Sequence, residues 1–110
     1  MPPPPNADVI DLQGRHVYPG MIESHSQLGL TELSSTRATI DTSEVGLLNP
    51  NVTAATAVNP DSELIPVTRA NGVLVALSAP SGGVVSGKAS LLQLDGWTSV
   101  DMTLQRESGL

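Results

Sequence analysis

The chain has 110 residues, which suits one domain or part of one, whereas a closed eight-stranded α/β barrel typically needs about 250 residues. Hydrophobic residues make up 39% of it, but only Tyr18 and Trp97 are aromatic, so the core must come from aliphatic side chains and Met. Eleven acidic residues against five scattered basic ones give a net charge of −6, which argues against nucleic acid as a partner.

The start of the chain and its apolar content also limit the class of protein. No apolar stretch approaches the roughly 20 residues that span a bilayer, and the Pro-rich start lacks both the basic and the apolar region of a signal peptide. We therefore expect a soluble chain with no membrane partner, and the sequence leaves its compartment open. Cysteine is absent, which excludes disulfides and thiolate chemistry. Residues 1–7 are predicted to form an extended lead-in, because consecutive prolines favour polyproline II, and residues 8–110 form the remaining segment.

The segment that follows the lead-in contains two predicted turns. Apolar residues in 9–12 and 17–18 flank Gly14-Arg15, a pattern that predicts a β-hairpin around a tight turn. Pro19-Gly20 then marks a sharp change of direction. The sequence therefore predicts a short hairpin ahead of the main body.

Residues 21–30 are predicted to begin with a strand in their first half. Strand alternation would place Glu23, His25 and Gln27 on one face, since side chains two residues apart point the same way. His16, by contrast, is expected to be a solvated residue of the hairpin.

A loop and a helix are predicted next. Residues 31–58 are small and polar without a persistent period, which indicates a long loop with short irregular pieces. Residues 59–62 suit a helix entry, and Pro66 must then lie in the first turn. Gly72 stands where a left-handed cap would end the helix.

The clearest strand of the chain covers residues 73–77, which are apolar throughout, as in strands buried on both faces of a parallel sheet. Strand, loop, helix and strand in this order predict a βαβ unit. Residues 91–94 form one more short apolar segment. Thr98 or Ser99 is expected to start a final helix that continues through Leu104.

The run from Val9 to Leu30 resembles the amidohydrolase superfamily, including imidazolonepropionase-like hydrolases, whose members carry a pattern of the form "v-I-D-a-x-G-x-x-v-x-P-G-l-I-D-x-H-x-H". The matching positions are Ile10, Asp11, Gly14, Pro19, Gly20, Ile22 and His25. Residues 59–72 would be the family's first barrel helix and 73–77 its second barrel strand. The resemblance thus implies an α/β fold: a partial (β/α)8-barrel comprising the first two strands with their connecting helix, preceded by a β-hairpin.

The resemblance implies a metal-dependent hydrolase of C–N bonds in amides or cyclic amides, with zinc as the expected divalent ion and a small-molecule amide as substrate. His25 matches the first of two histidines on the family's first strand, and Gln27 stands at the second, where a neutral oxygen is a weaker zinc ligand. Glu23 stands where Asp is usual, and we interpret it as orienting its neighbours. The substrate, the metal and the oligomeric state stay open.

The family's further ligands lie on later strands that this chain does not contain: a bridging lysine, two more histidines and an aspartate. The β-sandwich segment that usually precedes Asp8 is missing as well. Residues 8–110 are therefore expected to be a partial amidohydrolase-like barrel segment, an early piece of such an enzyme. We expect it to hold zinc poorly and to be inactive alone.

Two other readings come from different functional classes. Gly82 to Lys88 meets the G-x-x-x-x-G-K spacing of a phosphate-binding loop and would make the chain a weak nucleotide-binding module. Ala89 replaces the expected hydroxyl residue, and Asp95-Gly96 leaves little room for the helix that should follow. The third reading is a non-catalytic scaffold or interaction module, which could self-associate through open strand edges.

Overall fold

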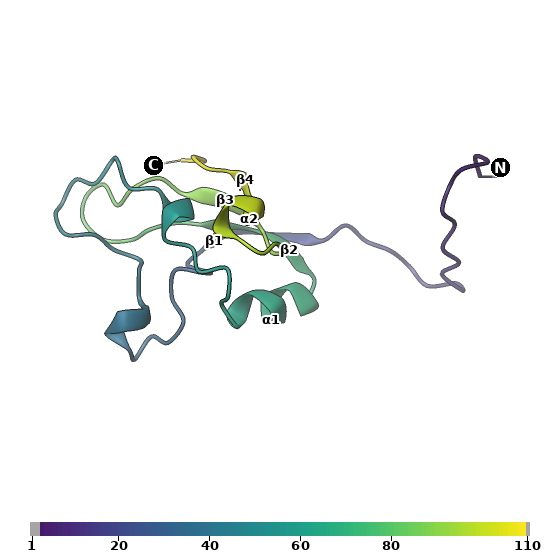
Figure 1. Cartoon of the computed structure of the whole chain (residues 1–110), viewed down its shortest axis with the longest axis horizontal. Helices are drawn as coiled ribbons and strands as arrows, with labels where there is room; N and C mark the ends of the chain where they lie inside the picture. Colours follow the sequence, from purple (N-terminus) through teal and green to yellow (C-terminus); the bar gives the residue numbers. More distant parts are fainter. Residues whose placement is uncertain (1–2, 110) are drawn as a thin grey trace.

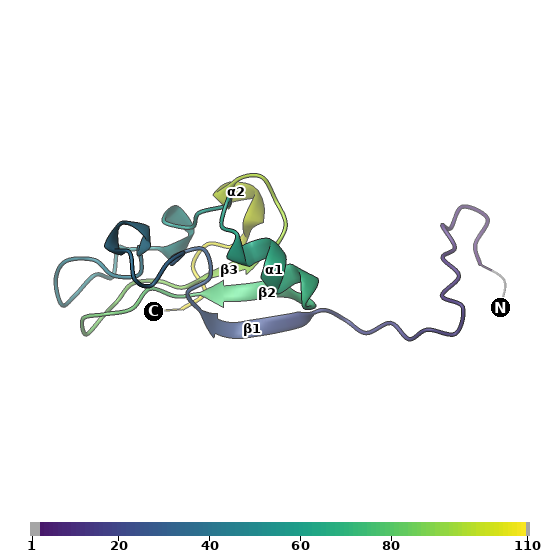
Figure 2. The same ribbon diagram turned by 90° about the horizontal axis from the view of Figure 1, so that it is seen from below.

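The structure is a computed structural model that describes residues 3–109. It is a mixed α/β fold built on a four-stranded sheet in the order β1-β2-β3-β4 (Figures 1 and 2). Two short helices pack on one face of this sheet, because residues of both share a buried cluster with β2. The elements are β1 (Met21–Ser26), the 3-10 turns η1 (Arg37–Thr39) and η2 (Ala54–Thr56), α1 (Leu64–Ala70), β2 (Val73–Ser78), β3 (Ser90–Gln93), α2 (Ser99–Met102) and β4 (Thr103–Gln105).

The predicted βαβ unit is confirmed, since β1 and β2 run parallel and α1 lies between them in the chain. Its helix begins after a turn in which the Leu64 amide donates to the Ser62 hydroxyl (3.3 Å). Pro66 lies in the first turn, where its missing N–H would have no intrahelical partner. Gly72 follows the end of the helix with φ of 92°, the left-handed conformation that the sequence predicts for a helix cap.

The β1–β2 ladder is irregular towards its carboxyl end. Glu23 pairs with Ala76 and Ser26 with Ser78, so β1 uses one more residue than β2 over this stretch. Such a bulge re-aims side chains and interrupts the alternation between faces. Because β1 also ends at Ser26, the predicted common face does not extend regularly to Gln27.

The core consists of two aliphatic clusters, as expected from the composition. Leu92 of β3 packs with residues from the loop before α1, and the second cluster joins both helices to β2 and the segment after β3. Tyr18 and Trp97 are 78% and 91% exposed and contribute nothing to either cluster. The members are Leu30, Ala54, Val58 and Leu92, and then Ile65, Ala76, Leu94 and Met102.

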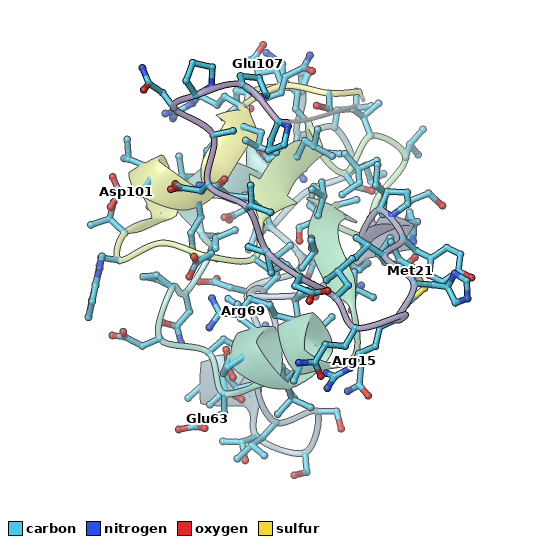
Figure 3. All side chains as sticks on the ribbon, turned by 90° about the vertical axis from the view of Figure 1, so that its right-hand side faces the viewer. Arg15, Met21, Glu63, Arg69, Asp101 and Glu107 are labelled. Atoms are coloured by element: carbon cyan, nitrogen blue, oxygen red, sulfur yellow. The ribbon has the colours of Figure 1, made fainter. Side chains whose placement is uncertain are left out.

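The 31–58 loop is confirmed, and hydrogen bonds attach it to the body. Glu32 accepts from the Ser62 hydroxyl (2.9 Å) and from the Asn59 amide (3.3 Å). At the far side of α1, Arg69 donates to the Leu94 carbonyl and pairs with the Asp95 carboxylate. Figure 3 shows Arg69 beside the helix α1. These contacts fix both ends of α1 against segments that are distant in the sequence.

The predicted hairpin over residues 9–18 is wrong. Its turn does form: the Arg15 amide donates to the Leu12 carbonyl (2.9 Å), with φ of 51° at Gln13 and 81° at Gly14. The flanking residues form no strand, and the chain leads away from the body as an arm (Figure 1). The apolar side chains of both flanks are exposed, and a two-stranded hairpin without a covering layer is marginal in water.

Two further expectations are corrected at the end of the chain and in β2. The final helix begins after Thr98, whose hydroxyl accepts from the Asp101 amide (3.1 Å), but it ends at Met102. Leu104 lies instead in β4, antiparallel to β3, because pairing of the β3 edge replaces continuation of the helix. β2 is not buried on both faces, since Leu74 is 47% exposed. Within residues 3–109, no helix has the length and apolar character needed to cross a membrane.

Candidate active site

The carboxyl ends of the parallel strands β1 and β2 lie side by side and position His25. Ser26 is the ladder partner of Ser78, and its hydroxyl donates to the Leu77 carbonyl (3.4 Å). The Ser78 hydroxyl donates in turn to the Leu28 carbonyl (2.7 Å). These bonds hold the turn after β1 against the end of β2, which is the edge where α/β sheets place their ligands.

His25 lines a cleft of about 390 Å³ at this edge. The end of β2 and the connection from β2 to β3 form most of the wall, and the last described residues of the chain close one side. The other lining residues are Leu77, Ala79, Pro80, Val84, Val85, Ser86, Gly87, Ala89, Ser108 and Gly109. Of the predicted metal-site residues His25, Gln27 and Glu23, only His25 lines this cleft, which also includes residues 84–87 of the predicted phosphate loop.

Gln27 and Glu23 lie near His25 but outside the lining of the cleft. The Gln27 side-chain amide donates to the Ser81 hydroxyl (3.2 Å), so it turns toward the loop after β2. Glu23 accepts from the backbone amide of His25 through Oε1 (3.2 Å). This bond fits the orienting role expected for Glu23.

The described residues contain no complete metal-binding set. Across residues 3–109 no group of three or more His, Cys, Asp or Glu side chains is arranged to hold an ion. A catalytic zinc needs about three protein ligands and an open position for water. His25 and Gln27 therefore supply at most part of a coordination shell.

The connection Gly82–Lys88 has the glycine spacing of a phosphate loop, but several of its backbone amides donate to carbonyls of the protein and are not free to bind a phosphate. The amides of Val84 and Val85 donate to the Leu47 carbonyl (2.7 and 3.0 Å), and the Lys88 amide donates to the Val52 carbonyl (2.8 Å). A Cβ at Gly83 would lie 2.9 Å from the Leu47 carbonyl oxygen, so close packing requires that glycine. The Lys88 ammonium pairs with Glu107 (2.9 Å), and the strand β3 follows in place of a helix.

Ser108 is a site residue that sequence reasoning missed. Its amide donates to the Ala89 carbonyl (2.8 Å), and the Ala89 amide donates to the Gly109 carbonyl (3.1 Å), which fixes the last described residues along the cleft. Among residues 3–109, the Ser108 hydroxyl oxygen is buried and has no hydrogen-bond partner. No local sequence pattern predicts that Ser108 lies at the site, because only its backbone pairing with Ala89 brings it there.

Replacing Ser108 by alanine is expected to raise the free energy of unfolding by about 1 kcal/mol, since a buried unpaired hydroxyl costs about 1–3 kcal/mol. Ser86→Ala is the matched control, because the Ser86 hydroxyl donates to the Gly82 carbonyl (2.7 Å) and its removal should destabilise. Urea unfolding measures the free energy of unfolding of both variants. The slope of this free energy against urea concentration should stay unchanged. Destabilisation by Ser108→Ala would show that its hydroxyl has a partner.

Comparison with solved structures relates this geometry to a known fold. The chain is similar to an amidohydrolase from Thermotoga maritima MSB8, with a TM-score of 0.89 and 25% sequence identity. The match covers 99% of this chain and 29% of that chain, so this chain spans less than a third of the length of that protein. No protein-family model and no curated protein matches the sequence. The likeness supports a hydrolase-type origin of the fold, in line with the resemblance of residues 9–30.

Proposed function

We propose that this chain forms the first-strand part of the active site of a metal-dependent hydrolase of C–N bonds in amides or cyclic amides. One observation carries the proposal: a fold similar to part of an amidohydrolase over 99% of the chain has His25 at the carboxyl end of its first parallel strand. His25 lines a cleft there, which is where barrel enzymes of this type hold their catalytic groups.

In this proposal His25 is a metal ligand, Gln27 is a weak one and Glu23 orients the backbone at His25 through the bond to its amide. In hydrolases of this kind the divalent ion lowers the pKa of a bound water and polarises the scissile carbonyl. The described residues do not complete the ligand set, so the remaining ligands must come from elsewhere in the functional enzyme. We therefore expect the chain alone to show no amide hydrolysis.

The test measures where zinc binds. Competition with a chromogenic chelator is expected to show wild-type zinc affinity no higher than that of a surface imidazole, because one histidine cannot close a coordination shell. His25→Ala should lower the remaining affinity more than His16→Ala, which removes an exposed histidine from the arm. Tight wild-type binding that His25→Ala leaves unchanged would contradict the assignment of β1.

A further inference from the structure

A second cleft lies beside the helix α1, away from the cleft that His25 lines. It has a volume of about 360 Å³ and is formed by residues 60–63, 65–66, 69 and 94–97, which we call the α1 groove. One wall is the segment before α1 with the helix itself, and the other is the segment between β3 and α2. The two clefts share no lining residue, so the α1 groove can be tested separately from the proposed hydrolase site.

Trp97 lines the α1 groove with an almost fully exposed indole, since the residue is 91% exposed. The backbone on both sides of it is held in place. Gly96 packs so closely on buried Met102 that a Cβ there would lie 2.8 Å from Cγ of Met102. The Thr98 hydroxyl accepts from the Asp101 amide (3.1 Å) at the start of α2. The ring is therefore presented to solvent on a fixed backbone, and the face of a tryptophan attracts cations more strongly than that of any other side chain.

The floor of the α1 groove is apolar. Ile65 and Leu94 are 5% and 1% exposed and belong to the core cluster that joins both helices to β2, so the groove reaches the core. Pro60 and Pro66 add aliphatic rings to the lining. The methylene chain of a long basic side chain can lie along such a surface while its charged end stays at the polar rim.

Negative charge surrounds this apolar floor. The acidic lining residues are Asp61, Glu63 and Asp95. Arg69 is the one basic residue of the lining, and it already pairs with Asp95. Among residues 3–109, Asp61 and Glu63 form no ion pair, so their two charges remain for a ligand. The net charge of −6 on the chain further favours a cation and disfavours an anionic membrane or nucleic acid.

We propose that the α1 groove is a docking surface for an arginine side chain carried by an extended segment of a partner protein. The guanidinium lies between the indole of Trp97 and the carboxylates of Asp61 and Glu63, and the methylenes lie on the apolar floor. Arginine fits this surface better than lysine, because a guanidinium is planar, stacks on aromatic rings and binds carboxylates through paired hydrogen bonds. This interaction goes beyond the proposed hydrolase function and does not depend on it.

The experiment follows the fluorescence of Trp97, the only tryptophan of the 110-residue chain. Acetylated and amidated tripeptides with alanine at both ends and arginine, citrulline or lysine in the middle are titrated into the chain. Citrulline keeps the shape of arginine and removes its charge. The arginine peptide is expected to bind at least about fivefold more tightly than the citrulline peptide and about threefold more tightly than the lysine peptide. Methylguanidinium, which lacks the methylene chain, should bind at least about fivefold more weakly than the arginine peptide.

Two charge variants locate the binding site. Glu63 lines the groove, whereas Asp101 lies on α2 outside it, and both residues are exposed. Glu63→Gln and Asp101→Asn each remove one negative charge from a surface position, so both should fold and lose the same long-range attraction. Glu63→Gln should weaken binding of the arginine peptide at least about threefold, while Asp101→Asn should change it by less than about 1.5-fold.

A third variant tests the stacking contact. Trp97→Leu keeps an apolar side chain but removes the aromatic face and the fluorescence, so binding is measured from the backbone amide resonances of the groove by NMR. The arginine peptide should bind this variant at least about fivefold more weakly than the wild type. No core contact is lost, because Trp97 belongs to neither core cluster.

Absence of binding of the arginine peptide would overturn the proposal, as would equal affinity for the arginine and citrulline peptides. Equal losses in the two charge variants would mean that the peptide responds only to the net charge of the chain. Unchanged binding to Trp97→Leu would remove the stacking contact, and tighter binding of the lysine peptide would remove the preference for arginine. Methylguanidinium binding as tightly as the arginine peptide would indicate a site for small cations in place of a docking surface. Each of these four results contradicts the proposal as well.

Discussion

Replacing Leu92 by alanine is expected to lower the melting temperature of the chain by about 10–30 °C. Leu92 lies in the interior strand β3, is 1% exposed and packs with Leu30, Ala54 and Val58. Buried Leu→Ala changes cost about 2–5 kcal/mol, and single domains have only about 5–15 kcal/mol in total. A core without aromatic side chains has little surplus to compensate for the cavity.

Leu104→Ala is the control for this prediction. Leu104 is 53% exposed and lies on the edge strand β4, so its truncation leaves no closed cavity and should change the melting temperature by a few degrees. Thermal melting followed by circular dichroism measures both. Similar losses in the two variants would show that the Leu92 cluster is not the dominant part of the core.

Replacing Gln27 by histidine is expected to raise zinc affinity by at least about tenfold, equivalent to about 1.4 kcal/mol. An imidazole is a better zinc ligand than a neutral amide oxygen. We expect the two side chains to share the ion, because Gln27 turns toward Ser81, while His25 lines the cleft with the nearby residues Ala79 and Pro80. Both side chains therefore approach the same loop after β2.

Competition with a chromogenic chelator again measures the affinity, with two controls. Gln105→His adds a histidine on the exposed edge strand β4 and should raise affinity little. The double variant Gln27→His with His25→Ala should lose the gain, because one imidazole is again left alone. An equal gain from Gln105→His, or a gain that survives loss of His25, would mean that the two positions do not share an ion.

Much of the fold was predictable because its signals are local. The continuous apolar run at residues 73–77 indicated β2. Residues 59–62 indicated the start of the helix, and Gly72 indicated its end. Likewise, the position of His25 at the end of the first strand followed from its place after Pro19-Gly20. Backbone conformation at these points depends on the residues themselves and their nearest neighbours, so the sequence alone determined them.

The remaining features depended on contacts between distant segments. Residues 9–18 contain hairpin signals and a formed turn, yet no sheet or helix covers their apolar faces, so the strands do not pair. The helix after Thr98 is short because pairing with β3 takes Leu104 into β4. The cleft has the same origin: only the backbone bonds between Ala89 and residues 108–109 bring Ser108 to the wall that His25 shares. Sequence periodicity carries no information about such pairings, and the tertiary structure alone decided them.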